Sequence, residues 1–331
     1  MVSASRRTLL AIGIVAVVCR GAAAQTSRGS AAESEPDLLA IDVQRGVAIA
    51  VGTHGAAWTM RVGDNRWVRH PTPTRTELLS VSVVSPRDAW AVGIGGAFLH
   101  FDGRDWQSVA GTAARSFRAV RMKNRNAGLA VGDNRVRHYR RPHWGRFSAM
   151  VAIPRFTALA RVGRHRSERF VAVGAGGAAV AFSGVGTSLT ADAEMTGTTA
   201  DLSAVDGCRH RKSQAIAVGS VALLREWNGA WRAVSPPPEP LTDVVAQCRR
   251  GRIARAFAVG ASGLHVFDAA SGQWTTRPVA GEPLALAWAD RRRLLVVGRR
   301  GFWQLVDAAA AAPAAGAKAA APVAPPQPVP R

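Results

Sequence analysis

The stretch LLSVSVVSPRDAWAVGIGGAFLHFDGRDWQSVAG (78–111) contains four short apolar runs, LLSVSV, AWAVG, AFLHF and DWQSVA. Turn-forming residues separate them: SPRD at 85–88, GIGG at 93–96 and the DG pair at 102–103. Apolar runs of this length, rich in Val, Phe and Trp and bounded by Gly, Pro and Asp, are typical of β-strands. The stretch therefore predicts four antiparallel strands, A to D, joined by short turns.

The second of these runs recurs along the chain. A Val-Gly pair closes each copy, with its Val at positions 51, 92, 131, 173, 218, 259 and 297. A four-stranded unit repeated seven times at a spacing near 40 residues predicts an all-β fold, a seven-bladed β-propeller of four-stranded antiparallel blades. The seventh unit contains strands A (284–288), B (294–298) and C (301–306) but no strand D. We therefore expect a three-stranded last blade or weak completion by a terminal segment.

Two residue types recur with the strands. Tryptophan begins strand D in five units, at Trp67, Trp106, Trp144, Trp231 and Trp274. A large ring at this repeated place predicts packing between neighbouring blades. The Gly of each Val-Gly pair begins the B–C turn, where we expect a positive φ to be convenient.

The pattern Leu-x-x-Val, Trp-Ala-Val-Gly, Phe-Asp-Gly-x-x-Trp resembles the Asp-box (BNR) repeat propellers. More narrowly, it is similar to the propellers of the photosystem II stability/assembly factor group and their exported bacterial relatives. The Asp-box reads Ser/Thr-x-Asp-x-Gly-x-x-Trp, whereas DGRDW at 102–106 lacks the Ser/Thr and the residue between Asp and Gly. The resemblance therefore implies the fold, and it carries no function to this chain.

The two ends of the chain differ in composition from the repeats. Residues 1–24 are typical of an export signal peptide, with Arg6 and Arg7, an apolar run at 9–18 and AAA at 22–24. SRRTLL (5–10) resembles the twin-arginine export motif, and an ordinary secretory signal is the alternative. The apolar run is too short for a transmembrane anchor, so we expect a periplasmic or secreted protein, cleaved near Ala24–Gln25.

Four segments follow from these patterns. They are the signal peptide (1–24), a polar linker (25–37), the propeller (38–307) and an Ala/Pro-rich tail (308–331). The tail has too little large apolar surface to offset the entropy of ordering, and its composition predicts disorder.

The chain is strongly basic, with 43 Lys and Arg against 22 Asp and Glu and a formal net charge of +21. Because neighbouring strands alternate in direction, the A–B and C–D loops share one face, and the D–A and B–C loops share the other. The predicted A–B loops of blades 3 to 7 concentrate this charge. They carry Arg121, Lys123, Arg125, Arg164, Arg166, Arg169, Arg209, Arg211, Lys212, Arg249, Arg250, Arg252, Arg255, Arg291, Arg292 and Arg293.

The opposite face is predicted to be mildly acidic. Its D–A loops carry Glu77, Asp192, Glu194, Asp201, Glu239 and Glu282. Closely spaced guanidinium groups bind carboxylates and phosphates. The basic residues given above for the A–B loops, without Arg169, are therefore the candidate partner-binding set. Surface charge that serves only solubility is the alternative.

Cys208 and Cys248 occupy matching places, just after strand A of blades 5 and 6. Equivalent points on adjacent blades lie close together near the axis, and an exported protein meets an oxidising compartment, so we expect a Cys208–Cys248 disulfide. Two buried thiols, or a metal site with His165 and His210, are the alternatives. The cationic surroundings disfavour a metal, and no metal or cofactor is predicted.

No catalytic residues are predicted. The chain has one Tyr, Tyr139, and it lacks a nucleophile elbow, a zinc-binding helix and paired carboxylates at fixed spacing. The first hypothesis is an exported, non-enzymatic binding or assembly platform for an acidic protein segment or an anionic polymer of the cell envelope. The charge would also suit nucleic acid, which is not favoured because aromatic residues are not interleaved with the arginines.

Two other functions are alternatives to this platform. One is a glycan-directed hydrolase or lyase with its site on the face of the D–A and B–C loops. The other is an assembly factor for a membrane complex, which the resemblance to the photosystem II group implies.

Overall fold

The computed structural model describes residues 35–109, 115–148, 153–184 and 188–309. The predicted signal peptide, residues 25–34 of the linker and residues 310–331 of the tail lie outside the described residues. The described part belongs to a unit that begins at Glu35. Over these ranges, no helix has the length and apolar character needed to cross a membrane.

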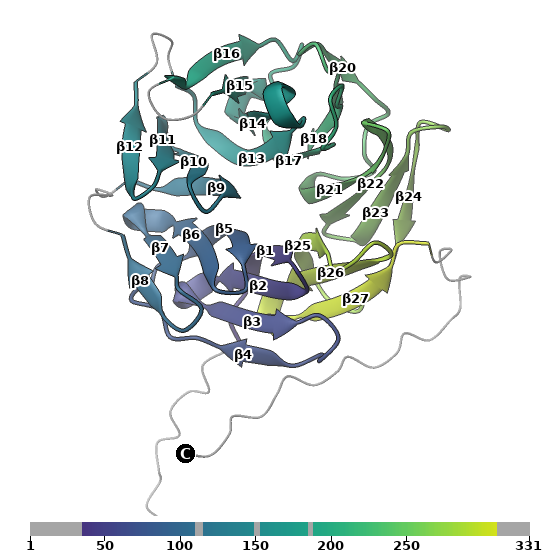
Figure 1. Cartoon of the computed structure of the whole chain (residues 1–331). Coiled ribbons are helices and arrows are strands. Elements are labelled where there is room, and N and C mark those ends of the chain that lie inside the picture. Colours follow the sequence, from purple (N-terminus) through teal and green to yellow (C-terminus); the bar gives the residue numbers. More distant parts are fainter. Residues whose placement is uncertain (1–34, 110–114, 149–152, 185–187, 310–331) are drawn as a thin grey trace, which may run out of the picture. The chain divides into compact units, whose positions relative to one another are not determined.

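Seven antiparallel sheets form the propeller (Figure 1). The strands of blades 1 and 2 are β1 (Leu38–Gln44), β2 (Val47–Gly52), β3 (Ala57–Arg61), β4 (Trp67–Arg69), β5 (Leu78–Ser85), β6 (Asp88–Gly93), β7 (Phe98–Phe101) and β8 (Trp106–Ser108). Those of blades 3 and 4 are β9 (Phe117–Asn124), β10 (Ala127–Gly132), β11 (Arg135–Arg140), β12 (His143–Phe147), β13 (Phe156–Val162), β14 (Arg169–Gly174), β15 (Ala179–Ser183) and β16 (Thr190–Glu194).

The remaining blades continue in the same order. The strands of blades 5 to 7 are β17 (Leu202–Gly207), β18 (Ala215–Gly219), β19 (Ala222–Arg225), β20 (Trp231–Ala233), β21 (Leu241–Arg249), β22 (Arg252–Gly260), β23 (Gly263–Asp268), β24 (Gln273–Arg277), β25 (Pro283–Trp288), β26 (Arg293–Gly298) and β27 (Trp303–Asp307). The predicted seven-bladed propeller is confirmed, and its last blade has three strands.

The first strand of each blade is innermost and lies beside the first strand of the next blade, and β25 lies beside β1 (Figure 1). The seven inner strands thus surround a central channel. Short strand connections place the A–B and C–D loops on one face of the ring, named the A–B face below.

The recurrent Gly at the end of strand B allows two backbones to come close. Gly52 and Gly93 have φ of −171° and −166°, which is extended backbone, so the expected positive φ is wrong. A Cβ on Gly93 would lie 1.9 Å from the carbonyl oxygen of Glu77, just ahead of strand A in the same blade. The positive φ comes two and three residues later, at Gly95 (63°) and Gly96 (82°). Close approach, and not turn geometry, therefore requires this Gly.

The strand D tryptophans pack against the preceding blade, as predicted. Trp67 lies in one buried cluster with Leu295 and Trp303 of blade 7. Trp106 lies in another with Ile49 of blade 1. Large indoles at the outer edge therefore extend the apolar contact between blades across the width of the ring.

Among the described residues, blade 7 has three strands, β25 to β27, and backbone contacts to the segment before β1 close the ring. Backbone hydrogen bonding joins Gly301 N–H to the carbonyl oxygen of Pro36 at 2.9 Å. The side chain of Asp37 accepts a hydrogen bond from Arg300 N–H, also at 2.9 Å. Together with the shared cluster around Trp67, these contacts form the seam between blades 7 and 1.

Candidate binding face

The A–B face carries several hollows. One of about 810 Å³ lies over blades 2 and 3, and its walls include the A–B loop residues Arg87 and Arg125 and the C–D residues Asp102 and Arg141. A neighbouring hollow of about 770 Å³ shares Lys123, Arg161 and Arg209 with it. The face is therefore recessed around the mouth of the channel, and cations outnumber carboxylates in the walls of both hollows.

The structure distributes the predicted partner-binding set over loops and strand ends. Loop or turn positions are held by Arg125, Arg164, Arg166, Arg209, Arg211, Lys212, Arg250, Arg291 and Arg292. Strand positions are held by Arg121, Lys123, Arg249, Arg252, Arg255 and Arg293. The assignment of these six residues and of Arg169 to A–B loops is wrong, because β9 continues to Asn124, β14 begins at Arg169, β21 ends at Arg249, β22 begins at Arg252 and β26 begins at Arg293.

The channel wall is built by carboxylates that bridge neighbouring blades. Asp42, Asp206 and Asp243 each accept a hydrogen bond from a backbone N–H of the next inner strand, from Val83 (2.7 Å), Ala246 (2.8 Å) and Leu286 (3.0 Å). Each inner strand is a sheet edge, and these bonds satisfy donors that the edge would otherwise leave unpaired.

The three channel carboxylates have raised pKa values. Burial is the main cause for each, and it raises the pKa of Asp243 to about 6. Arg121 acts in the opposite direction on all three. Its guanidinium donates to the carbonyl oxygens of Val81 (3.3 Å) and Leu159 (3.2 Å) and lies 3.8 Å from Asp42. Arg121 is thus a structural cation of the channel.

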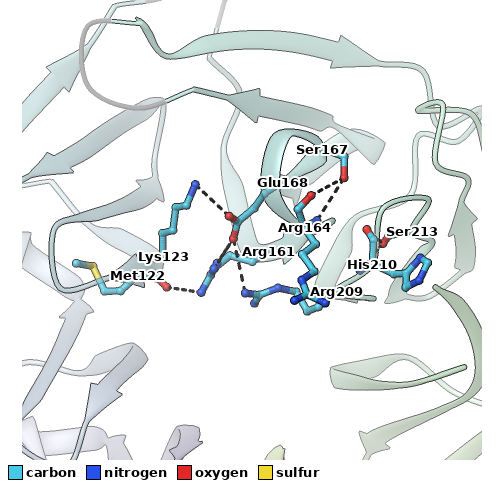
Figure 2. A network of polar contacts seen from close by, with 9 residues as sticks. All are labelled: Met122, Lys123, Arg161, Arg164, Ser167, Glu168, Arg209, His210 and Ser213. Atoms are coloured by element: carbon cyan, nitrogen blue, oxygen red, sulfur yellow. Dashed lines mark hydrogen bonds and ion pairs between the residues drawn. The ribbon is translucent and has the colours of Figure 1, made fainter. Parts of the chain in front are cut away.

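At the channel mouth, Glu168 joins three cations from three blades (Figure 2). It forms ion pairs with Lys123 (3.0 Å), Arg209 (3.6 Å) and Arg161, which also donates to the carbonyl oxygen of Met122 (3.1 Å). Burial alone would raise the pKa of Glu168, but hydrogen bonds from Arg161 and Lys123 outweigh it and hold the pKa below its usual value. Glu168, Lys123, Arg161 and Arg209 are named here the Glu168 network, in which one carboxylate is paired with three cations.

The loop that carries Arg209 is held from several sides. The structure places Cys208 and Cys248 in a disulfide, with their Cα atoms 5.7 Å apart. Gly163 N–H donates to the carbonyl oxygen of Cys208 (2.9 Å), and His210 N–H donates to the hydroxyl of Ser213 (2.8 Å). The loop therefore presents its cations from a fixed backbone.

Most of the predicted partner-binding set has no carboxylate at ion-pair distance in the described part of the chain. Arg121 pairs with Asp42, Lys123 and Arg209 with Glu168, Arg255 with Asp268 and Arg293 with Asp290. The cations without such a partner are Arg125, Arg164, Arg166, Arg211, Lys212, Arg249, Arg250, Arg252, Arg291 and Arg292. This face therefore holds uncompensated positive charge.

Sequence reasoning missed the aromatic wall of the hollow over blades 2 and 3. Trp90, His100 and Tyr139 line it, and the rings of Trp90 and His100 lie 4.2 Å apart. Asp88 fixes His100 through a 3.0 Å contact. Trp90 stands in strand B, where the other blades have smaller apolar residues or Phe, and this departure from the repeat was the available signal.

The acidic residues of the opposite face serve mainly as internal partners. Asp201 accepts a hydrogen bond from Gly176 N–H of the preceding blade (2.7 Å), as Asp37 does from Arg300. Glu239 accepts from Ser262 N–H (2.8 Å) and contacts His265 (2.7 Å). Asp192 and Glu194 are not in a D–A loop as expected, because β16 extends over Thr190–Glu194. Asp192, Glu194 and Glu282 are also paired with arginines, so part of the negative charge predicted for the opposite face is offset within the chain.

Within the described ranges, no group of three or more His, Cys, Asp and Glu side chains is placed to hold a metal ion. The carboxylates described above are each engaged by backbone N–H groups or cations. The cations of the A–B face are guanidinium and ammonium groups, which in proteins bind carboxylates and phosphates.

Among the comparisons with known proteins, only solved structures match this chain, and they share its fold. No protein-family model matches the sequence. No curated protein matches it at a significant level. A solved structure described as YCF48 bound to D1 peptide aligns with a TM-score of 0.63 at 15% identity, covering 82% of this chain and 93% of that one.

Two further solved structures show the same architecture. The WD40 β-propeller domain of Doa1 aligns with a TM-score of 0.62 at 10% identity, over 82% of this chain and 93% of that one. The computationally designed Ika8 protein aligns with a TM-score of 0.58 at 12% identity, over 83% and 98%. None of the three is described as an enzyme. At these identities the similarity establishes the propeller fold and leaves function to the site.

Proposed function

We propose that this protein is an exported, non-enzymatic binding platform that holds an acidic protein segment on its A–B face, in the periplasm or outside the cell. The Glu168 network carries the proposal, because it concentrates Lys123, Arg161 and Arg209 at the channel mouth around a single carboxylate. The unpaired cations around this network extend the positive surface over the neighbouring blades.

The geometry favours carboxylates as the bound groups. A guanidinium can donate two parallel hydrogen bonds to one carboxylate, and closely spaced cations raise the local concentration of an anionic partner. Arg164 and Arg166 are exposed and line the same hollow as Glu168. An extended acidic segment could therefore engage several guanidinium groups in succession.

A protein segment is favoured over a uniformly charged polymer by the aromatic wall. Trp90, His100 and Tyr139 line the adjoining hollow beside its cations. Trp90 and Tyr139 are each only 6% exposed, so the half-buried ring of His100 offers most of the apolar contact there. The similar propeller YCF48 is described as bound to a peptide, which supports a peptide partner here.

The test is binding of a labelled peptide of ten glutamates to the chain without its signal peptide, measured by fluorescence anisotropy. We expect binding that weakens strongly between ~50 and ~300 mM salt, as the Debye length falls from about 14 to about 6 Å. The variant Arg164→Glu/Arg166→Glu should lose most of this binding.

The matched control is Arg75→Glu/Arg115→Glu, which makes the same change in net charge on the D–A loops of the opposite face. Both control residues are exposed. Equal losses in the two double variants would show that only net charge matters and would overturn the assignment to the A–B face.

The β21–β22 hairpin tests how far the binding face extends. Arg249, Arg250 and Arg252 lie at its tip, and they line none of the hollows described above. Retention of envelope proteins at ~50 mM salt by the natural chain, and their loss in Arg249→Glu/Arg250→Glu/Arg252→Glu, would extend the face to blade 6. Unchanged retention would confine it to blades 2 to 5.

A further inference from the structure

Trp227 is an exposed aromatic residue outside the repeated pattern of the blades. It lies in the C–D turn of blade 5, between β19 and β20, and its exposed fraction is 56%. The turn is closed by Glu226 N–H bonding to Ala230 O (2.7 Å) and by Ala230 N–H bonding to the side-chain oxygen of Asn228 (3.2 Å). Neither bond requires an indole at 227. An exposed tryptophan that the fold does not need is a candidate for contact with a partner.

Cations surround this indole. The ammonium of Lys212 lies 5.0 Å from the centre of the ring. Arg166 and Arg211 line the same hollow, which has a volume of about 580 Å³. None of these three cations has a carboxylate at ion-pair distance over the described ranges. The hollow thus combines an accessible aromatic surface with uncompensated positive charge.

The floor of the hollow is rigid. Arg225 has an exposed fraction of 2%, and its guanidinium is bound through two nitrogens to Glu194, with Nε at 2.7 Å from Oε2. Trp231 donates its indole N–H to the same carboxylate at 2.8 Å. A site with a fixed floor loses little conformational freedom when a ligand binds.

The two hydroxyls of the hollow and the side-chain oxygen of Asn228 are already hydrogen-bonded within the chain. The hydroxyl of Ser167 donates to the carbonyl oxygen of Arg164 (2.9 Å), and that of Ser213 donates to the carbonyl oxygen of His210. The side-chain oxygen of Asn228 accepts within its own turn. A sugar would need such groups for its hydroxyls, whereas an aromatic ring between acidic residues needs only the indole and the cations.

We propose that Arg166, Arg211, Lys212 and Trp227, named here the Trp227 subsite, receive an aromatic side chain of the bound protein segment, with acidic neighbours paired to the cations. This rests on the proposed function, because it specifies the sequence of the same acidic segment. The subsite shares Gly163 and Arg166 with the hollow of the Glu168 network, so one segment can occupy both. The partner motif is therefore an aromatic residue within a run of Asp or Glu.

The experiment compares three ten-residue peptides: all Glu, Glu with one central Phe, and Glu with one central Leu. We expect the Phe peptide to bind about 3- to 10-fold more tightly than the all-Glu peptide at equal salt, and more tightly than the Leu peptide. In Trp227→Ala this gain should disappear while the affinity for the all-Glu peptide stays within about 2-fold, since the arginines remain. Trp227→Phe, which keeps a ring, should retain part of the gain.

Each other outcome has a distinct meaning. No gain from Phe in the natural chain, or a gain that persists in Trp227→Ala, overturns the subsite. A Trp227-dependent preference for an acidic oligosaccharide, such as oligogalacturonate, over the Phe peptide also overturns it and assigns the hollow to a glycan. Failure of the all-Glu peptide to bind the natural chain contradicts the proposed function itself.

Discussion

The carboxylate of Asp37 accepts a hydrogen bond from the backbone N–H of Arg300, 263 residues further along the chain, at 2.9 Å. The same kind of bond links Asp201 to Gly176 N–H, between blades 5 and 4. One type of contact therefore joins blades that are consecutive in sequence and the two blades that meet at the ends of the propeller. The seam needs it more, because blade 7 has three strands in the described part of the chain, one fewer than each other blade.

Asp37→Ala should lower the stability of the ring by about 1 kcal/mol, since a hydrogen bond to a charged group is lost at a partly exposed site. That corresponds to a fall in Tm of about 2–4 °C for a domain of this size. Hydrogen exchange should become faster in β25 to β27. Asp201→Ala is the control, and its effect should stay near Gly176. Unchanged exchange in blade 7 of Asp37→Ala would show that the apolar seam alone closes the ring.

Asp243→Asn tests the channel carboxylates through pH. Burial raises the pKa of Asp243 to about 6, so the folded state binds this proton more tightly than the unfolded state between about pH 4 and pH 6. The contribution of Asp243 to stability is therefore full below about pH 4 and is lost as the pH rises through 6. Urea denaturation should show a larger deficit of the variant at pH 4 than at pH 7. A deficit that does not change with pH would mean that Asp243 titrates normally.

Glu168→Gln should give the opposite pH dependence. The pKa of Glu168 is held below its usual value by Arg161 and Lys123, so its contribution to stability is present above about pH 4.5 and is lost as the pH falls through the lowered pKa. The variant should have a lower Tm than the natural chain at pH 7, and the two should converge in acid. Arg75→Gln, on the opposite face, should match the natural chain at both pH values.

Removal of the disulfide tests the support of the Arg209 loop. Cys208 and Cys248 are separated by 40 residues, and a cross-link over such a loop stabilises a fold by about 3–4 kcal/mol in the chain-entropy model. Cys208→Ser/Cys248→Ser should therefore unfold at clearly lower temperature and bind the all-Glu peptide more weakly. The natural chain should gain one hydrogen on each sulfur after reduction, seen by intact mass spectrometry, and an unchanged mass would disprove the pairing.

The fold was predictable because the Val-Gly pair recurs once in each of the seven blades. The structure explains the Gly: a Cβ on Gly93 would clash with the backbone just ahead of strand A. The length of β9 was harder to predict. RMKN follows the apolar run with alternating polarity, and backbone pairing with β10 extends the strand over these polar residues. Arg121 was for that reason assigned to a loop, although it points into the channel.

The candidate site was predictable in charge and not in arrangement. Lys123, Glu168 and Arg209 come from three blades, and only the register of their strands and the closure of the ring bring them together. The channel carboxylates are not strictly periodic either. Asp42 and Asp206 pair with the residue three before the Val-Gly glycine, whereas Asp243 pairs with the residue one before it. Trp227 lies in the C–D turn and not at the start of strand D, and its exposure became known only from the folded chain.

The three-stranded seventh blade has a mechanical consequence. β27 is held by β26 on one side only, so a force applied at Asp307 across the strand loads the β26–β27 hydrogen bonds one after another, beginning at the Arg293–Asp307 pair. Bonds broken in sequence resist far less tension than bonds sheared together. The propeller should therefore open from its C-terminal blade under load, while β1, flanked by the seam, holds until β25 has separated from it.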